Sequence, residues 1–387
     1  MYHKHYRMKK LPIGIQEFSE LISGGYLYVD KTKYIYSLLK NKYFFLSRPR
    51  RFGKSLLLNT IKEIYKGSKQ LFEGLWIYDK IDWEEHPVIK LSFSSLSYFT
   101  EGLDKAINDE MIMIGQQFGI VLETNDYSSR FRELIRKLGQ NKKVVILIDE
   151  YDKPIIDYID NIPQAEENRK ILKNFYSVIK DSDSHIEFFF ITGVSKFSQV
   201  SIFSDLNNLN DITLDKNYAT ITGYTQEEMD FYFPEYIQKV TDDYPDIIDD
   251  IPSMIKRWYN GYSWDGKHFV YNPFSILNFL SKREFSDYWF RTGTPTFLMK
   301  LIKKNKYTIF DIEKRTIFKS ELDKYDIDNI SLIPILFQTG YLTIKKTDWQ
   351  GMITLDFPNA EVDRSFTIHV LAAMDEGKIG NASTLLT

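Results

Sequence analysis

Four short runs of consecutive apolar residues constrain the fold of this chain most strongly. They lie at residues 43–46, 87–93, 144–148 and 187–191, and a weaker fifth run lies at 218–222. Runs that are apolar on both faces are typical of strands buried inside a parallel sheet. Segments with the helical spacing of apolar residues separate them, as at 166–180. The alternation predicts an α/β fold with a parallel sheet within residues 1–225.

The composition excludes several classes of protein. The chain has 387 residues, of which 43% are apolar and 16% aromatic, and it has no cysteine. The aromatic content argues against disorder, and the lack of cysteine excludes a disulfide scaffold and a thiol nucleophile. No apolar run approaches the roughly 18–20 residues of a membrane span. No apolar h-region follows the basic start, so we expect no secretory signal. We expect a cytoplasmic protein without a membrane partner, and the formal charge of −3 argues against a globally basic nucleic-acid binder.

Beyond residue 225 the pattern becomes mostly helical. Thr225 and Glu228 have the spacing of a capping box at a helix start. Further helices are expected at Ser253–Tyr259, Pro273–Leu280, Pro295–Lys303 and Ser331–Thr339, and a hairpin at Tyr341–Ile344 and Met352–Phe357. Helices followed by a hairpin indicate a winged-helix unit. The expected domains after the sheet are therefore a helical domain at 226–330 and a winged-helix or hairpin end at 331–365.

A phosphate-binding loop follows the first apolar run. Residues 47–55 read SRPRRFGKS and precede a helical pattern, which is the strand–loop–helix context of a P-loop. Gly53 permits a tight turn into the helix, whose N-terminal N–H groups favour phosphate oxygens. Lys54 would reach the β- and γ-phosphates and act in catalysis, and the Ser55 hydroxyl would hold Mg²⁺.

This loop departs from the general P-loop pattern in one place. Arg48 stands where the general pattern has its first glycine. The backbone of the loop would therefore follow a different course, fixed by Pro49. The arginines of the loop would add positive charge beside the phosphates. The residues expected to contact the nucleotide are Arg48, Pro49, Arg50, Arg51, Phe52, Gly53, Lys54, Ser55 and Leu56.

The third apolar run supplies the other half of a nucleotide site. It ends in an acid pair, VVILIDE, which is the Walker B pattern. Asp149 would orient Mg²⁺, since a hard cation prefers oxygen ligands, and Glu150 would polarise the attacking water. The pair also marks the P-loop branch with an additional strand and a catalytic glutamate, and residues 87–93 are placed to supply that strand between the two motifs. The alternative is a core strand that ends in two solvated acids.

Two further assignments remain open on the sequence alone. Thr192 ends the fourth run and would sense the γ-phosphate or position water, or it is simply part of a strand-to-loop turn. Transition-state charge also needs a cation, for which Arg50, Arg51 and Arg257 are candidates against the alternative of solvated surface arginines. A metal-nuclease cluster at Asp149–Lys153 is disfavoured, because the apolar strand and the GKS segment both indicate a nucleotide site.

With these motifs, the chain resembles the bacterial AAA-ATPase-like family, whose members commonly carry a C-terminal PD-(D/E)XK nuclease domain. The matching segments include LPIGIQEFSELI, YLYVDKTKYI, SRPRRFGKSL, VVILIDEYDKPI, WYNGYSW, YNPFSILNFL, FQTGYLTI and FPNAEV, within residues 11–365. The family shows the same arginine at position 48. The resemblance implies an ATPase domain at 1–225 and places Asp30 near the nucleotide, by the adenine. Residues 366–387 would be the start or a remnant of the nuclease domain, so nuclease activity is not expected.

Three functions follow from these residues and the resemblance. The first is an ATP- and Mg²⁺-dependent ATPase that acts as a nucleotide switch or motor. The second is a nucleotide-regulated module that does not hydrolyse ATP and binds a protein partner or itself. The third is a DNA-associated ATPase of a nuclease, defence or mobile-element system, which would contact nucleic acid.

Overall fold

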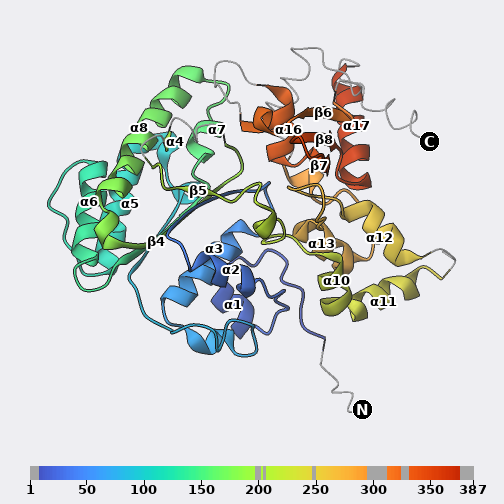
Figure 1. Cartoon of the computed structure of the whole chain (residues 1–387), viewed down its shortest axis with the longest axis horizontal. Coiled ribbons are helices and arrows are strands. Elements are labelled where there is room, and N and C mark those ends of the chain that lie inside the picture. The colour runs from blue at the N-terminus through green and yellow to red at the C-terminus, as the bar shows by residue number, and fades with distance from the viewer. Residues whose placement is uncertain are drawn as a thin grey trace.

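A computed structural model of the chain describes residues 8–196, 202–203, 206–245, 250–293, 312–323 and 331–374. The helix expected at Pro295–Lys303 and the tail after residue 374 lie outside these residues. Two groups of elements are seen in Figure 1, a sheet with its helices and a mainly helical C-terminal part beside one edge of that sheet.

The first group is built on a five-stranded parallel sheet. Its strands are β1 (Tyr43–Ser47), β2 (Val88–Ser92), β3 (Val144–Asp149), β4 (Ile186–Gly193) and β5 (Asn210–Asp211). Their order across the sheet is β2-β3-β4-β1-β5, and every pair is parallel. The four strongly apolar runs are therefore strands, and the predicted α/β class with a P-loop type of sheet is confirmed.

Two expectations about the sheet are wrong. Residues 218–222 form no strand, and the fifth strand is instead Asn210–Asp211. The run at 218–222 is apolar because Tyr218 and Ile221 are buried in the core that α1, α2 and α3 form with the sheet, although the segment itself is not a strand. The run at 87–93 lies between the two nucleotide motifs in the sequence, but in the sheet it does not lie between β1 and β3, the strands that carry them. Its strand β2 occupies the sheet edge, and β4 separates β1 from β3.

Helices cover both faces of the sheet (Figure 1). The helices are α1 (Phe18–Ser23), α2 (Thr32–Leu38) and α3 (Lys54–Tyr65) on one face, and α5 (Leu103–Gln117), α6 (Tyr127–Leu138) and α8 (Ile162–Asp181) on the other. Successive side chains of a strand point to opposite faces. Thus Phe44 and Leu46 pack against α3, whereas Phe45 packs in the core formed with α5, α6 and α8. Burial on both faces explains why these strands are continuously apolar.

Short helical segments complete this part of the chain. They are η1 (Lys69–Phe72), η2 (Phe93–Ser95), α4 (Tyr98–Glu101), α7 (Lys153–Ile156), η3 (Asp183–His185) and η4 (Lys216–Tyr218). Among the described residues, no helix combines the length and the apolar character that a membrane crossing requires.

The C-terminal part consists of helices and a small antiparallel sheet. Its helices are α10 (Gln226–Tyr232), α11 (Pro234–Asp243), α12 (Ile251–Tyr259), α13 (Pro273–Lys282), α14 (Phe290–Gly293), η6 (Lys319–Asp323), α16 (Leu332–Thr339) and α17 (Ala360–Met374). Its strands are β6 (Arg315–Phe318), β7 (Thr343–Thr347) and β8 (Met352–Asp356), in the order β6-β8-β7. The capping box of Thr225 and Glu228 and the β7–β8 hairpin are confirmed. The winged-helix assignment and the domain boundaries stay predictions.

The P-loop packs directly on the C-terminal part. Phe52 is buried in the apolar core that contains Tyr262 and Trp264. Gly340 ends α16 in the left-handed region, with φ +93°, and a Cβ there would lie 2.9 Å from the Cβ of Pro49. The small size of Gly340 therefore allows the C-terminal part to approach the loop closely.

Gly340→Ala should destabilise the protein by about 2–5 kcal/mol. Left-handed backbone costs an alanine roughly 1–2 kcal/mol, and overpacking against Pro49 adds about 1–3 kcal/mol. Gly351→Ala is the matched control, because Gly351 also has a positive φ of +84°, but a Cβ at that position would have no neighbouring atom within 4 Å. Urea unfolding should show a clearly larger loss for position 340 than for position 351. Equal losses would contradict the close contact with Pro49.

Candidate nucleotide-binding site

The GKS segment forms the turn from β1 into α3. Gly53 precedes α3 with a φ of +83°, in the left-handed region that glycine adopts without strain. Lys54 is buried, and its Nζ donates to the carbonyl oxygens of Arg48 at 2.8 Å and Pro49 at 2.9 Å. Burial lowers the pKa of the Lys54 ammonium, although the negative charge of Asp149 opposes this. The loop thus curls around a lysine whose present partners are neutral carbonyls.

Asp149 joins the three elements that meet behind the loop. The Ser55 hydroxyl on α3 donates to Asp149 Oδ2 at 2.6 Å. The Thr192 hydroxyl on β4 donates to Asp149 Oδ1 at 2.7 Å. The structure therefore brings together three residues that lie in three separate segments of the sequence. A hydroxyl that donates its proton to a carboxylate keeps its lone pairs free, so Ser55 can offer oxygen to a cation.

Glu150 lies beside this cluster in an unusual backbone conformation. Its φ is +54°, which is uncommon for a residue other than glycine and turns it away from the line of β3. It is partly buried and lines a cavity in front of the loop. Burial and the negative charge of Asp149 raise the pKa of the Glu150 carboxyl, while Lys54 opposes this. A raised pKa brings a carboxylate closer to the range of an effective general base.

Asp152 has a different environment from Asp149 and Glu150. It is fully enclosed, and its Oδ2 accepts from Ser195 N at 2.6 Å, Ser195 Oγ at 2.8 Å and Val194 N at 3.1 Å. These bonds hold the chain where it leaves β4. Because the Asp152 carboxylate already accepts these buried hydrogen bonds, it is not placed to bind a metal ion, and the geometry does not support a nuclease cluster at Asp149–Lys153.

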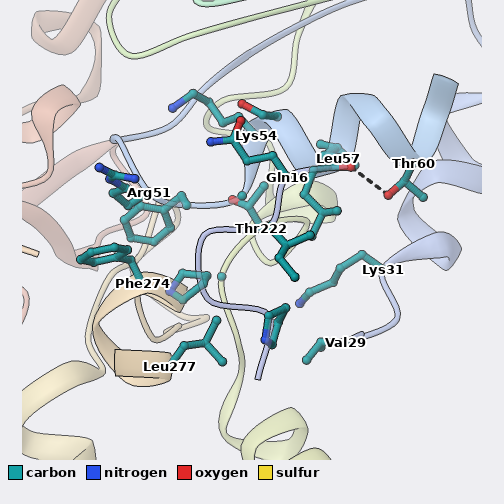
Figure 2. Close-up of a pocket in the computed structure, with 18 of the residues that line it drawn as sticks. Gln16, Val29, Lys31, Arg51, Lys54, Leu57, Thr60, Thr222, Phe274 and Leu277 are labelled. Carbon is teal, nitrogen blue, oxygen red and sulfur yellow. Dashed lines mark hydrogen bonds between the residues drawn. The ribbon is translucent and has the colours of Figure 1, made fainter. Parts of the chain in front are cut away.

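A cavity of about 420 Å³ opens in front of the loop (Figure 2). In this view Val29 and Lys31 lie on one side, Phe274 and Leu277 on the other, and Arg51 and Lys54 toward the loop end. The lining residues come from five segments: Pro12, Gly14, Ile15, Gln16, Leu21, Leu27, Tyr28, Val29 and Lys31; Arg50–Leu57 with Thr60; Glu150 with Lys153; Ile221–Tyr224; and Pro273, Phe274 and Leu277. The cavity has the size of a small-molecule site.

Arg48 does not face this cavity. Its side chain is completely buried, and its guanidinium donates to the carbonyls of Ser47 at 2.9 Å, Thr213 at 2.8 Å and Tyr218 at 3.1 Å. The Trp264 ring lies 3.9 Å from the guanidinium carbon. Burial lowers the pKa of Arg48 to about 9. Neither Arg48 nor Pro49 lines the cavity, whereas the other expected residues of the loop, from Arg50 to Leu56, do.

Asp30 also points away from the cavity. Its Oδ1 accepts from the backbone N of Thr32 at 2.8 Å and from the Thr32 hydroxyl at 2.6 Å, and its Oδ2 accepts from Trp76 N at 2.7 Å. Its neighbour Lys31 lines the cavity instead, although sequence reasoning did not single it out. The YVDKT segment was the available signal, but it could not show which side chain turns inward.

Lys31 connects the start of the chain to the C-terminal part. Its Nζ donates to Glu228 Oε1 at 2.6 Å and to the Thr220 carbonyl at 2.9 Å. Burial lowers the pKa of Lys31, and the Glu228 charge opposes this. Glu228 therefore both completes the cap of α10 and neutralises a buried lysine beside the cavity.

The candidate arginines fall into two places. Arg50 and Arg51 line the cavity, and the Arg51 guanidinium lies 4.9 Å from the centre of the Phe274 ring. Arg257 lies in a separate hollow, which it shares with Lys256, Lys267 and other residues of the C-terminal part. The structure therefore brings Arg50 and Arg51 to the site but does not bring Arg257 there.

Comparisons with known proteins cover most of the chain. A family model described as a predicted AAA-ATPase matches residues 12–203, which hold the loop, Asp149, Glu150 and Thr192. A protein of Azotobacter chroococcum mcd 1, described as an uncharacterised protein in the vnfD 5′ region, is 42% identical over 366 residues. That match spans 92% of this chain and 69% of the relative, so it includes the C-terminal part as well as the sheet.

Arg48→Met should lower the free energy of unfolding by about 2–4 kcal/mol. Methionine keeps much of the apolar stem but leaves three buried carbonyls without their donor, at about 1–3 kcal/mol for each group left unsatisfied and partly relieved by relaxation. Arg50→Met is the control, because Arg50 is exposed on the same loop and should change stability by less than about 0.5 kcal/mol. Urea unfolding without nucleotide measures both. An Arg48→Met protein as stable as the wild type would show that the guanidinium is not a structural tie.

Proposed function

The chain belongs to the AAA-ATPase-like family, and from this premise we propose that it binds ATP with Mg²⁺ in the cavity and hydrolyses it to ADP and phosphate. The observation that carries the proposal is the 2.6 Å contact between Ser55 and Asp149. It places a hydroxyl and a carboxylate, one from each nucleotide motif, at a single point beside a buried lysine.

Phosphate binding follows from the loop and the start of α3. The first N–H groups of a helix have no partner within the helix, and the helix dipole favours anions there. Lys54 would exchange its two carbonyl partners for oxygens of the β- and γ-phosphates. That exchange is favourable, because the buried ammonium would then be paired with anionic oxygens instead of neutral carbonyls.

The donors at the loop end fit a magnesium ion. Ser55 and Asp149 offer only oxygen, which is what Mg²⁺ prefers, and Mg²⁺ keeps several of its waters when bound. When bound, the ion would neutralise charge on the phosphates. The bond from Thr192 would hold Asp149 in the orientation that this role requires.

Glu150 is the proposed general base. It would accept a proton from the water that attacks the γ-phosphorus while the bond from that phosphorus to the bridging oxygen breaks and ADP leaves. Arg50 and Arg51 are the cations placed to stabilise the developing charge, since both line the cavity. Catalysis of this kind depends on positioning and electrostatics and needs no covalent intermediate.

The remainder of the cavity suits the nucleoside. Its far walls are mostly apolar and include Ile15, Val29 and Leu277, while Gln16 and Thr222 supply polar groups. Apolar walls with a few placed polar groups are typical of small-molecule sites. The adenine would lie between the N-terminal segment and α13.

A nucleotide-regulated module without hydrolysis is the second candidate. Lys54 and Asp149 would bind the nucleotide in both candidate functions, so Glu150 is the residue whose substitution distinguishes hydrolysis from binding alone. A protein partner, self-association, contact with DNA and a cytoplasmic location stay predictions from the sequence.

Lys54→Ala should weaken ATP binding by about 100-fold or more, because two charged hydrogen bonds are lost at about 1.5–3 kcal/mol each. Lys66→Ala is the control, since Lys66 lies exposed at the other end of α3. Isothermal titration calorimetry with ATP and Mg²⁺ measures both affinities. Equal binding by wild type and Lys54→Ala would overturn the proposed phosphate site.

Glu150→Gln should slow ATP hydrolysis by about 10²–10⁴-fold, which is the usual contribution of a general base, and change ATP affinity by less than about 3-fold. Glu167→Gln, an exposed substitution on α8, should leave the rate unchanged. Phosphate release at saturating ATP measures the rates. Unchanged turnover in Glu150→Gln would remove Glu150 from the mechanism, and tight ATP binding by a wild type without turnover would favour the second candidate.

A further inference from the structure

The C-terminal part contacts every residue of the loop between Ser47 and Gly53. The contacts are Arg48 with Trp264, Pro49 with Gly340, the Arg50 carbonyl with Trp289, Arg51 with Phe274, and Phe52 with Tyr262 and Trp264. Aromatic side chains supply most of them. The segments WYNGYSW and FQTGYLTI, which had no assigned role, thereby meet at the nucleotide loop.

The hydrogen bond of Trp289 is the directional contact in this set. Its indole Nε1 donates to the Arg50 carbonyl at 3.1 Å. That carbonyl shares a peptide unit with the N–H of Arg51, and a peptide unit is planar. A donor that fixes the carbonyl therefore also fixes the direction of the next N–H group, which belongs to the loop that would surround the phosphates.

Trp289 is itself held on two sides. Its ring packs 5.3 Å from the ring of Tyr341, and the missing side chain of Gly340 leaves room for it. Its backbone N–H donates to Glu361 Oε1 at 2.6 Å. Glu361 lies in the first turn of α17 and is completely buried. Burial raises the pKa of Glu361 to about 7, although the Ser275 hydroxyl and the Trp289 N–H oppose this.

We propose that Trp289 and Glu361 are positioning residues for the nucleoside triphosphate. Glu361 fixes the backbone at Trp289, the indole of Trp289 fixes the Arg50–Arg51 peptide, and this peptide sets the N–H direction that the phosphates meet. The inference rests on the proposed function. It adds that the affinity for the phosphates depends on residues of the C-terminal part that do not touch the nucleotide.

Thermodynamic linkage gives this arrangement a second consequence. If the contact of Trp289 raises nucleotide affinity by some factor, bound nucleotide strengthens that contact by the same factor. The C-terminal part therefore senses whether the loop is filled. The contact acts on the bound ground state and the transition state alike, so its loss should raise KM and leave kcat unchanged.

Trp289→Phe tests the proposal, because phenylalanine keeps an aromatic ring but removes the indole N–H. We expect ATP affinity to fall by about 3- to 10-fold, the usual effect of one hydrogen bond, with kcat within about 2-fold of the wild type. Trp349→Phe is the matched control, since the Trp349 side chain is 90% exposed, and it should match the wild type in both. Wild-type affinity in Trp289→Phe would overturn the proposal.

Substitutions at Glu361 test whether it acts through Trp289. Glu361→Gln keeps an oxygen acceptor for the Trp289 N–H and should bind ATP within about 2-fold of the wild type. Glu361→Leu removes the acceptor and should weaken binding in the same direction as Trp289→Phe. The double variant Trp289→Phe/Glu361→Leu should lose little more ATP affinity than whichever single variant binds ATP less tightly, because both changes break one chain of contacts. Fully additive losses would contradict action through Trp289.

Hydrogen exchange without nucleotide separates this proposal from the ATPase proposal. The amides of residues 50–53 should exchange about 3- to 10-fold faster in Trp289→Phe than in Trp349→Phe, because the loop opens more often. If the wild type fails to bind ATP, the proposed function fails, yet the exchange rates still test the contact. Equal exchange in the two variants would overturn the positioning role whatever the ATP result.

Discussion

The buried guanidinium of Arg48 is the contact on which the arrangement of the two parts depends. It donates to carbonyls at the end of β1 and in the segment after β5, and Trp264 of the C-terminal part covers its face. A buried charge is costly unless it is hydrogen-bonded. With a pKa of about 9, the group remains charged at neutral pH, so these partners must remain in place. One side chain thus fixes the course of the loop, the sheet edge and the nearest surface of the C-terminal part.

The shape of the candidate nucleotide site depends on this arrangement. Its phosphate end is formed by α3, β3 and β4, but its other walls come from the N-terminal segment and α13. The ion pair of Lys31 with Glu228 ties the N-terminal wall to α10 of the C-terminal part. Because the cavity lies between the two parts of the chain, a change in their packing changes its shape, and by linkage a ligand bound there would in turn affect the packing.

The sequence predicted what local pattern determines and missed what long-range contact determines. Apolar runs identified β1, β3 and β4. The motifs located Asp149 and Thr192 at the ends of β3 and β4 and Ser55 in the first turn of α3, which meet at one edge of the parallel sheet. The same reasoning misread residues 218–222, since a buried turn and a buried strand are equally apolar over five residues. The family resemblance placed Asp30 near the nucleotide, but a sequence match does not say which side chain of a segment faces a cavity, and Lys31 lines it instead. Sequence reasoning could not link Trp289 to Arg50, which lie 239 positions apart.

The loop departs from the general P-loop pattern at Arg48, and this departure accounts for the aromatic surface that the C-terminal part presents to it. A glycine at position 48 would let the backbone alone set the shape of the loop. Arginine instead fixes that shape through contacts outside the loop, and these contacts need carbonyls to accept its protons and a ring to cover its face. Once the loop depends on such contacts, residues that hold them, such as Trp264 and Trp289, become part of its structure. In the proposed function, a loop built in this way would bind phosphate only as well as the C-terminal part is docked, so docking and nucleotide binding would form one equilibrium and not two.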